Sequence, residues 1–351
     1  MKTLFLDRLP VAFRPYNDEA LTSWISRTAA VYGCSCREML SAYCGFRPEI
    51  FDNVDIQPSM IGLLVIQALV GGPIEQLKAC TLATAYPHWL PNWISRSPPN
   101  WHVTDRRTVP TTDIRPAVCL FCLTEDIDSG RSQYLRLSWL CSITTVCPIH
   151  LSPLVTCCSA YSMKTLAHQQ DWVQCKRMCC LGCCGAFDRS CDSTTDQQAL
   201  FAVAHLERQL RAGVGGNRIL DLIDRLLPSE NLLLFVEDMT WALMLPLDGS
   251  PFRVLHSMRT PQFRVPMGFN TPVDADNWLS CGPLQVRRSI LAVLSSLLLP
   301  AALCGTLVSP CGRGREFWKS MKYLHNAEQR QAFRDRAACW NPGLAEAVEF
   351  Y

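Results

Sequence analysis

Two short motifs near the middle of the chain carry residue types that bind metal ions. Cys119 and Cys122 are separated by two residues, and Cys147 and His150 have the same spacing. Zinc takes four thiolate or imidazole ligands in a tetrahedron, and two such pairs supply them without a large hydrophobic core. We therefore expect a zinc site here. Three cysteines and a histidine fill all four positions, whereas a catalytic zinc keeps one position open.

The remaining cysteines point to a second site. Twelve of the twenty cysteines lie between Cys119 and Cys191. The thiols that follow His150 outnumber the ligands that one further zinc ion needs, so we expect a second four-cysteine site with several alternative ligand sets. These thiols are Cys157, Cys158, Cys175, Cys179, Cys180, Cys183 and Cys184.

A disulfide framework is the competing explanation for so many cysteines. Residues Met1 to Pro10 contain no apolar segment of signal-peptide length and no small-residue cleavage site. We therefore expect a cytoplasmic protein whose thiols are reduced or bound to metal. The eight cysteines outside the cluster are expected to behave as small buried hydrophobic residues.

Length and charge set limits on the fold and on binding partners. A chain of 351 residues with 48% hydrophobic residues is expected to form two or three domains. The net charge of +2 gives no attraction of the whole molecule to nucleic acid, so a DNA-binding surface must be a local patch. The richest candidate runs from Arg313 to Arg336, although a solvated helix face explains it equally well. Its basic residues are Arg313, Arg315, Lys319, Lys322, Arg330, Arg334 and Arg336.

Short helices are predicted over residues 1–86. The first is capped by Asn17 or Asp18, ends at Gly33 and buries one face. Ser35 and Glu38 form a capping box for the second, which Gly45 ends. A third covers about Ser59 to Val70, and Pro73 opens a fourth that runs to Ala85. The buried face of the first helix consists of Leu21, Trp24, Ile25, Thr28, Ala29 and Tyr32.

The rest of the chain completes a mostly helical fold. Residues 87–116, rich in proline and tryptophan, are expected to connect the N-terminal domain to a zinc-binding region at 117–190. Within that region, residues 134–141 alternate in polarity as a half-buried strand does. We expect residues 191–351 to form a C-terminal helical bundle. Its uncharged segment 289–312 contains Pro300 and Gly305, so we expect a buried helix from about Leu284 to Leu299 rather than a membrane span.

Two blocks of residues resemble the TniQ family, the target-selection proteins of bacterial transposons related to the TnsD proteins. The first block is Pro15, Asp18, Glu19, Leu21, Ser23, Trp24 and Arg27. The second is Cys119, Cys122, Tyr134, Leu135, Arg136, Trp139, Cys147, Pro148, His150, Leu154 and Cys157. The blocks span about half of the chain. The family's next cysteine falls on Ala160 here, so Cys158 could replace it, or Cys175 could join Cys180 and Cys183.

The short N-terminal helices with a Gly-containing turn are compatible with a helix-turn-helix-like bundle that binds DNA, and also with any small helical bundle. The resemblance implies a zinc-ribbon-like region with two zinc sites, the second using Cys157, Cys180 and Cys183. It also implies a nucleoid-associated, non-catalytic adaptor in transposition. Such an adaptor links target DNA or a Cascade-like guide-RNA effector complex to an AAA+ ATPase regulator of the TnsC/TniB type, and through it to the transposase.

No catalytic motif contradicts the adaptor interpretation. The run Gly213-Val214-Gly215-Gly216 lacks the lysine of a phosphate-binding loop, and no paired carboxylates or Ser/His/Asp arrangement can be defended from spacing. The alternative hypothesis is a zinc-containing, sequence-specific DNA-binding regulator unrelated to transposition. The sequence leaves open whether the chain forms a homodimer.

Overall fold

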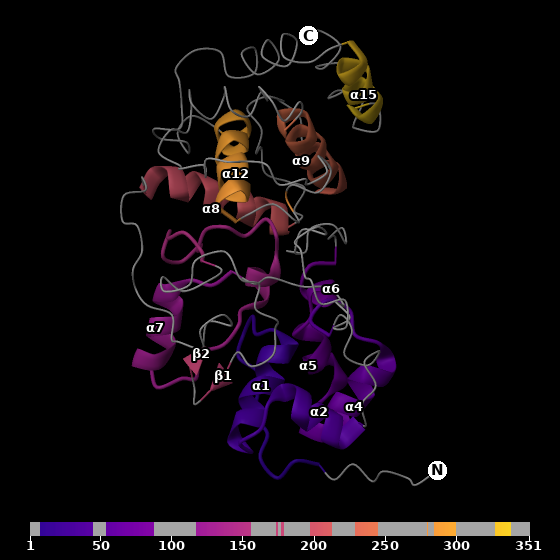
Figure 1. Cartoon of the computed structure of the whole chain (residues 1–351), viewed down its shortest axis with the longest axis vertical. Coiled ribbons are helices and arrows are strands. Elements are labelled where there is room, and N and C mark those ends of the chain that lie inside the picture. Colours follow the sequence, from indigo (N-terminus) through magenta and orange to yellow (C-terminus); the bar gives the residue numbers. More distant parts are fainter. Residues whose placement is uncertain are drawn as a thin grey trace, which may run out of the picture. The chain divides into compact units, whose positions relative to one another are not determined.

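The computed structural model describes the helices and the central segment of the chain. The described residues are 8–44, 54–87, 117–155, 173–174, 177–178, 197–212, 229–244, 279, 284–299 and 327–337. They form a mostly helical fold with two very short strands, and they divide between two compact units. One unit contains the elements from α1 to β2, and the other contains α8, α9, α12 and α15 (Figure 1).

The described part of the first unit begins with five helices, and the first four of them share one hydrophobic core. They are α1 (Leu21–Val31), α2 (Cys36–Cys44), α4 (Met60–Val70), α5 (Ile74–Ala79) and α6 (Leu82–Ala85). Trp24 and Ile25 of α1 pack in the same cluster as Ile66 and Leu69 of α4 and Leu77 of α5, and all five side chains are buried. The burial of Trp24, Ile25, Thr28 and Ala29 confirms this part of the predicted inner face of α1.

Several helix ends are set by local hydrogen bonds, and one of them is the predicted capping box of Ser35 and Glu38. Ser35 N donates to Glu38 Oε2 at 2.8 Å, and Glu38 N donates to Ser35 Oγ at 3.1 Å, which is the reciprocal capping box. Ser59 Oγ accepts from Gly62 N at 3.0 Å and caps α4. Gly71 follows α4 with a φ of 76°, a conformation that glycine adopts without steric cost.

The beginning of α1 differs from the prediction because its cap comes from a distant residue. The helix starts at Leu21 after the N-cap residue Ala20, while Asp18 has a φ of 59° and its carboxylate accepts from Ser138 Oγ at 2.9 Å. Asp55 Oδ1 instead accepts from Thr22 N at 2.7 Å, and Asp55 Oδ2 accepts from Thr22 Oγ1. Burial of this carboxylate raises its pKa to about 6.

Two further expectations for the N-terminal helices are wrong. Tyr32 is 39% exposed, and its hydroxyl exchanges hydrogen bonds with Val11 N and Val11 O, so it does not belong to the core. The helix opened by Pro73 breaks at Cys80 and Thr81 into α5 and α6. The break occurs because Cys80 O accepts from Leu21 N, while Leu82 N donates to Asp55 O.

The central segment contains α7 (Leu120–Asp128), the 3₁₀ turn η2 (Leu137–Leu140) and the paired strands β1 (Val173–Gln174) and β2 (Arg177–Met178). The strand expected over residues 134–141 is therefore wrong. Tyr134, Leu135 and Arg136 are all buried in succession, because the segment is covered on more than one side and does not alternate between core and solvent.

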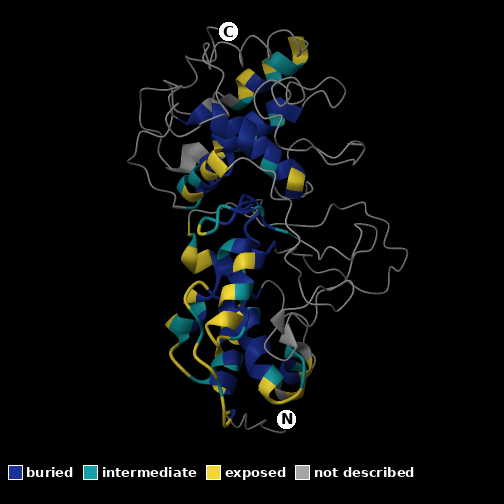
Figure 2. Ribbon diagram, turned by 90° about the vertical axis from the view of Figure 1, so that its left-hand side faces the viewer, coloured by how far each residue is buried: buried dark blue, intermediate teal, exposed yellow. Residues whose placement is uncertain are grey.

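The second unit is built from α8 (Gln197–Ala212), α9 (Ser229–Met244), α12 (Leu284–Leu298) and α15 (Ala327–Ala337). Helix α12 packs across α8, and buried residues line the contact (Figure 2). The buried helix predicted from about Leu284 to Leu299 is thus confirmed. Helix α15 packs on α9, where Phe333 stacks on Trp241 with ring centroids 6.5 Å apart. None of the described helices is long and apolar enough to cross a membrane.

Candidate metal centre

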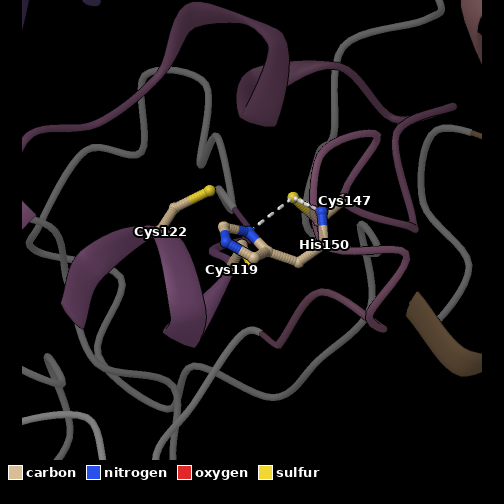
Figure 3. Close-up of side chains that lie close together, drawn as sticks. All are labelled: Cys119, Cys122, Cys147 and His150. Atoms are coloured by element: carbon tan, nitrogen blue, oxygen red, sulfur yellow. Dashed lines mark hydrogen bonds between the residues drawn. The ribbon is translucent and has the colours of Figure 1, made fainter. Parts of the chain in front are cut away.

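The four residues of the two central motifs lie together (Figure 3). One ligand atom from each of Cys119, Cys122, Cys147 and His150 lies within 4.8 Å of the other three. The cysteines are buried and the histidine is half-buried. The structure thus brings together the four residues that the sequence predicts for the first site.

Helix α7 positions the first pair of cysteines. Cys119 is the residue before the helix, and its carbonyl accepts from Leu123 N at 3.1 Å. Cys122 lies in the first turn, so both thiols are presented at the same end of α7. Val118 exchanges two backbone hydrogen bonds with Val155, at 2.8 and 2.9 Å, which fixes the entry to the helix.

A tight turn positions Cys147 and His150. Cys147 N donates to Ser152 O at 2.8 Å, and Leu151 N donates to Cys147 O at 2.9 Å. Leu151 has a φ of 45°, a rare value for a branched side chain, and it closes the turn. His150 N donates to Cys147 Sγ at 3.4 Å. Backbone donors of this kind stabilise negative charge on a metal-binding sulfur.

The segment before Cys147 is held by buried charges on α8 and α12. Glu207 of α8 accepts from Thr145 N at 2.8 Å, from Thr145 Oγ1 and from Val146 N at 3.3 Å. Arg288 Nε of α12 donates to Thr145 O at 3.2 Å, and Arg287 Nη1 donates to Ser142 O at 2.6 Å. Burial raises the pKa of Glu207 to about 7 and lowers the pKa of Arg288 to about 10.

The donor set fits zinc. Metal–ligand distances of about 2.0–2.3 Å place the corners of a tetrahedron roughly 3.3–3.8 Å apart. Cys147 Sγ and His150 Nδ1 are 3.5 Å apart, within this range. All four ligand atoms lie within 4.8 Å of one another, so small movements of the side chains would bring them to tetrahedral distances. Three thiols with one imidazole are the donors that zinc prefers in closed structural sites. These residues could therefore hold one metal ion.

A buried ion pair lies beside the first thiol pair. Arg136 donates to both carboxylate oxygens of Asp126, from Nη1 and from Nη2, at 3.1 Å each. Asp126 and Cys122 are four residues apart on α7 and therefore share one face of the helix. Burial alone would lower the pKa of Arg136, but the charges of Asp126 and Cys122 outweigh it and raise that pKa.

The two blocks of motif residues meet at a second buried cluster. Ala20 N donates to Leu135 O at 2.9 Å, and Leu137 N donates to Asp18 O at 2.6 Å. Ser23 Oγ accepts from Leu135 N at 2.9 Å and donates to Glu19 Oε1 at the same distance. These bonds join the start of α1 to the segment before η2.

Within this cluster, Glu19 forms a two-pronged ion pair with Arg27. The bonds from Arg27 Nε and Nη2 measure 2.7 and 2.6 Å, and both side chains are almost fully buried. The guanidinium lies 4.0 Å from the ring centroid of Tyr16, whose ring contacts Tyr134. The charges of Glu19 and Arg27 therefore hold the fold together and do not face solvent, whereas Asp18 of the same motif block is exposed.

Comparison with known protein families assigns this part of the chain. The model of the family described as TniQ matches residues 10–154. These residues form a TniQ domain. The match covers both motif blocks as far as Leu154 and confirms the resemblance seen in the sequence. No curated protein matches the chain.

Other predicted site residues lie outside the TniQ domain. Cys157, Cys180 and Cys183, together with Cys158, Cys175, Cys179 and Cys184, fall outside the residues that the structure describes. Most of the basic stretch Arg313–Arg336 does so as well. Its last part forms α15, where Arg336 pairs with Asp238 at 3.0 Å and stacks on Trp241.

Sequence analysis missed two buried carboxylates near the candidate metal centre. Glu207 and Asp126 are acidic residues on amphipathic helices, and spacing alone suggests that such residues face solvent. Glu207 accepts from Thr145, 62 residues away along the chain, and Asp126 pairs with Arg136, 10 residues away. The sequence does carry a signal for Asp126, because this residue follows the metal-ligand candidate Cys122 by one helical turn.

Proposed function

We propose that this protein is a non-catalytic adaptor that selects the target site in DNA transposition. The match of the TniQ domain over residues 10–154 carries the proposal. The adaptor would work in the cytoplasm on nucleoid DNA. It would link target DNA, or a guide-RNA effector complex, to an AAA+ ATPase regulator, which in turn brings the transposase.

The roles of the motif residues support an adaptor. Glu19 and Arg27 satisfy each other in the core, and Ser23 is bound to Glu19 and Leu135. Side chains used in this way are unavailable to a substrate, since a catalytic acid or base must reach the proton that it transfers. Their burial favours a scaffold that presents its surface to partners.

The metal centre would support the same scaffold. A closed set of three cysteines and one histidine leaves no position for a reacting water, so a zinc ion there would contribute folding free energy rather than catalysis. A second zinc ion bound through Cys157, Cys180 and Cys183 remains a prediction, as does the division of the chain at residues 86, 116 and 190.

Insertion mapping tests the adaptor function. Cells would carry a marked transposon with the transposase and AAA+ ATPase of the same element, with or without this chain, and the insertion sites would be sequenced. We expect insertions to concentrate at a defined target only when the chain is present. The double variant Cys119→Ser/Cys122→Ser should lose this concentration, whereas Glu75→Gln, an exposed change on α5, should keep it.

Binding experiments separate the versions of the proposal. Purified chain would be tested for binding to target DNA, to a guide-RNA complex and to the ATPase. Insertions that are equally frequent and equally scattered with and without the chain would refute the adaptor function. Tight binding to one DNA sequence, without binding to the ATPase, would favour a DNA-binding regulator unrelated to transposition.

A further inference from the structure

The ion pair of Arg136 and Asp126 fixes the guanidinium of Arg136 at one place inside the protein. Both bonds from Arg136 to the Asp126 carboxylate measure 3.1 Å. The guanidinium also lies 4.3 Å from the ring centroid of Tyr134 and 4.6 Å from that of Trp139. A planar cation that is hydrogen-bonded to a carboxylate and packed against two aromatic rings has little freedom to move.

Helix α7 places this charge next to the candidate metal ligands. Cys122 and Asp126 lie one turn apart on one face of α7, so the carboxylate that holds Arg136 is on the face of the helix that carries Cys122. Burial lowers the pKa of Arg136, and the charges of Asp126 and then Cys122 raise it by more. The ion pair and the shared helix face therefore place the charge of Arg136 on the side of α7 that carries the Cys122 sulfur.

We propose that Arg136 is the charge-compensating residue of the metal centre, held in position by Asp126. The inference rests on the metal site that forms part of the proposed function. A zinc ion with three thiolates and one neutral imidazole carries a net charge of −1 in a buried site. A buried charge without a partner is strongly unfavourable, and a fixed cation beside the sulfur offsets that cost.

Arg131 provides a matched control. Its Nη2 lies 3.3 Å from Oδ1 of the same Asp126 carboxylate, but its side chain is 46% exposed. An exposed charge is screened by water, so it contributes little to the metal centre. If proximity to Asp126 alone mattered, the two arginines would behave alike. If a buried cation beside Cys122 matters, only Arg136 has an effect.

The test measures zinc affinity of the full-length chain by competition with a chelator. Arg136→Gln should bind zinc about ten- to a hundredfold more weakly, the usual cost of losing a supporting residue. Arg136→Lys keeps the charge and should recover most of the loss, while Arg131→Gln should stay within about twofold of the unmodified protein. If Arg136→Gln does not fold, Arg136→Met, whose apolar side chain suits the contacts with Tyr134 and Trp139, replaces it.

Cobalt substitution adds a readout that a purely structural role would not change. A cation beside the sulfur stabilises its electrons and raises the energy of the sulfur-to-cobalt charge-transfer band. The band should therefore move to longer wavelength in Arg136→Gln and return in Arg136→Lys. Unchanged affinity in the neutral variant, or equal losses in the neutral and lysine variants, would overturn the inference. Failure of the unmodified chain to bind zinc would instead overturn the metal site itself.

Discussion

The buried carboxylate of Asp55 makes the stability of the N-terminal helices depend on pH. It caps α1 through Thr22 and has no oppositely charged partner among the groups that shift its pKa. Burial raises that pKa from 3.8 to about 6. The folded chain therefore holds this proton more tightly than the unfolded chain does, and the associated stability is complete below pH 3.8 and is lost as the pH rises to about 6.

The magnitude follows from the size of the shift. About two pKa units correspond to roughly 3 kcal/mol of unfolding free energy. Asp55→Asn removes the titration and keeps the hydrogen bonds, because the amide oxygen can accept from Thr22 N and the amide nitrogen can donate to Thr22 Oγ1. Relative to the unmodified protein, this variant should gain about 2.5 kcal/mol between pH 4 and pH 7.5, because part of the effect lies below pH 4.

Denaturant unfolding, followed by circular dichroism of the helices, measures this difference at each pH. Subtracting one protein from the other cancels the contributions of metal binding and of the other titrating groups that both chains share. Glu75→Gln, on the exposed side of α5, is the control and should show no comparable trend. A difference between Asp55→Asn and the unmodified protein that stays constant over this pH range would refute the reasoning.

Three further predictions concern the metal centre, the core and DNA. Cys119→Ser/Cys122→Ser should lower the zinc content by one equivalent and unfold the TniQ domain, because structural zinc contributes on the order of 10 kcal/mol; an unchanged zinc content by elemental analysis would contradict this. Glu19→Ala should destabilise the domain by about 3–5 kcal/mol in denaturant unfolding, because it leaves Arg27 buried without its partner. The control Glu125→Ala, an exposed change on α7, should have little effect. Equal losses of stability in the two variants would contradict the role of the Glu19–Arg27 pair. If the chain binds DNA through α15, Arg330→Gln/Arg334→Gln should weaken binding to all DNA sequences. The slope of log affinity against log salt concentration should fall by up to about 0.9 per lost phosphate contact. Weaker discrimination between DNA sequences with an unchanged slope would mean that these arginines contact bases.

Features that depend on neighbouring residues could be predicted from the sequence. The capping box of Ser35 and Glu38, the Ser59 cap and the stop at Gly71 each involve groups within a few residues of one another. The metal quartet was predictable because two pairs at fixed spacing have few other uses. The inner face of α1 followed from helical periodicity as far as Ala29.

Features that depend on distant residues could not be predicted. Alternating polarity over residues 134–141 indicated a strand, but Arg136 is buried because Asp126 pairs with it. Tyr32 matched the inner face of α1 by spacing, yet its hydroxyl contacts Val11. The start of α1 was misplaced because its cap, Asp55, lies 33 residues away from Thr22. In each case a tertiary partner overrides the local pattern.

The contact between the two motif blocks bears on how the chain folds during synthesis. A nascent chain that ends at Ala85 already contains Asp55, the cap of α1, but it lacks Leu135 and Leu137. Until those residues leave the ribosome, Ala20 N–H and Asp18 C=O have no partners from that segment, and Ser23 Oγ lacks one of its two bonds. The N-terminal helices therefore reach their final stability only after the segment that carries Cys119 and Cys122 has been translated.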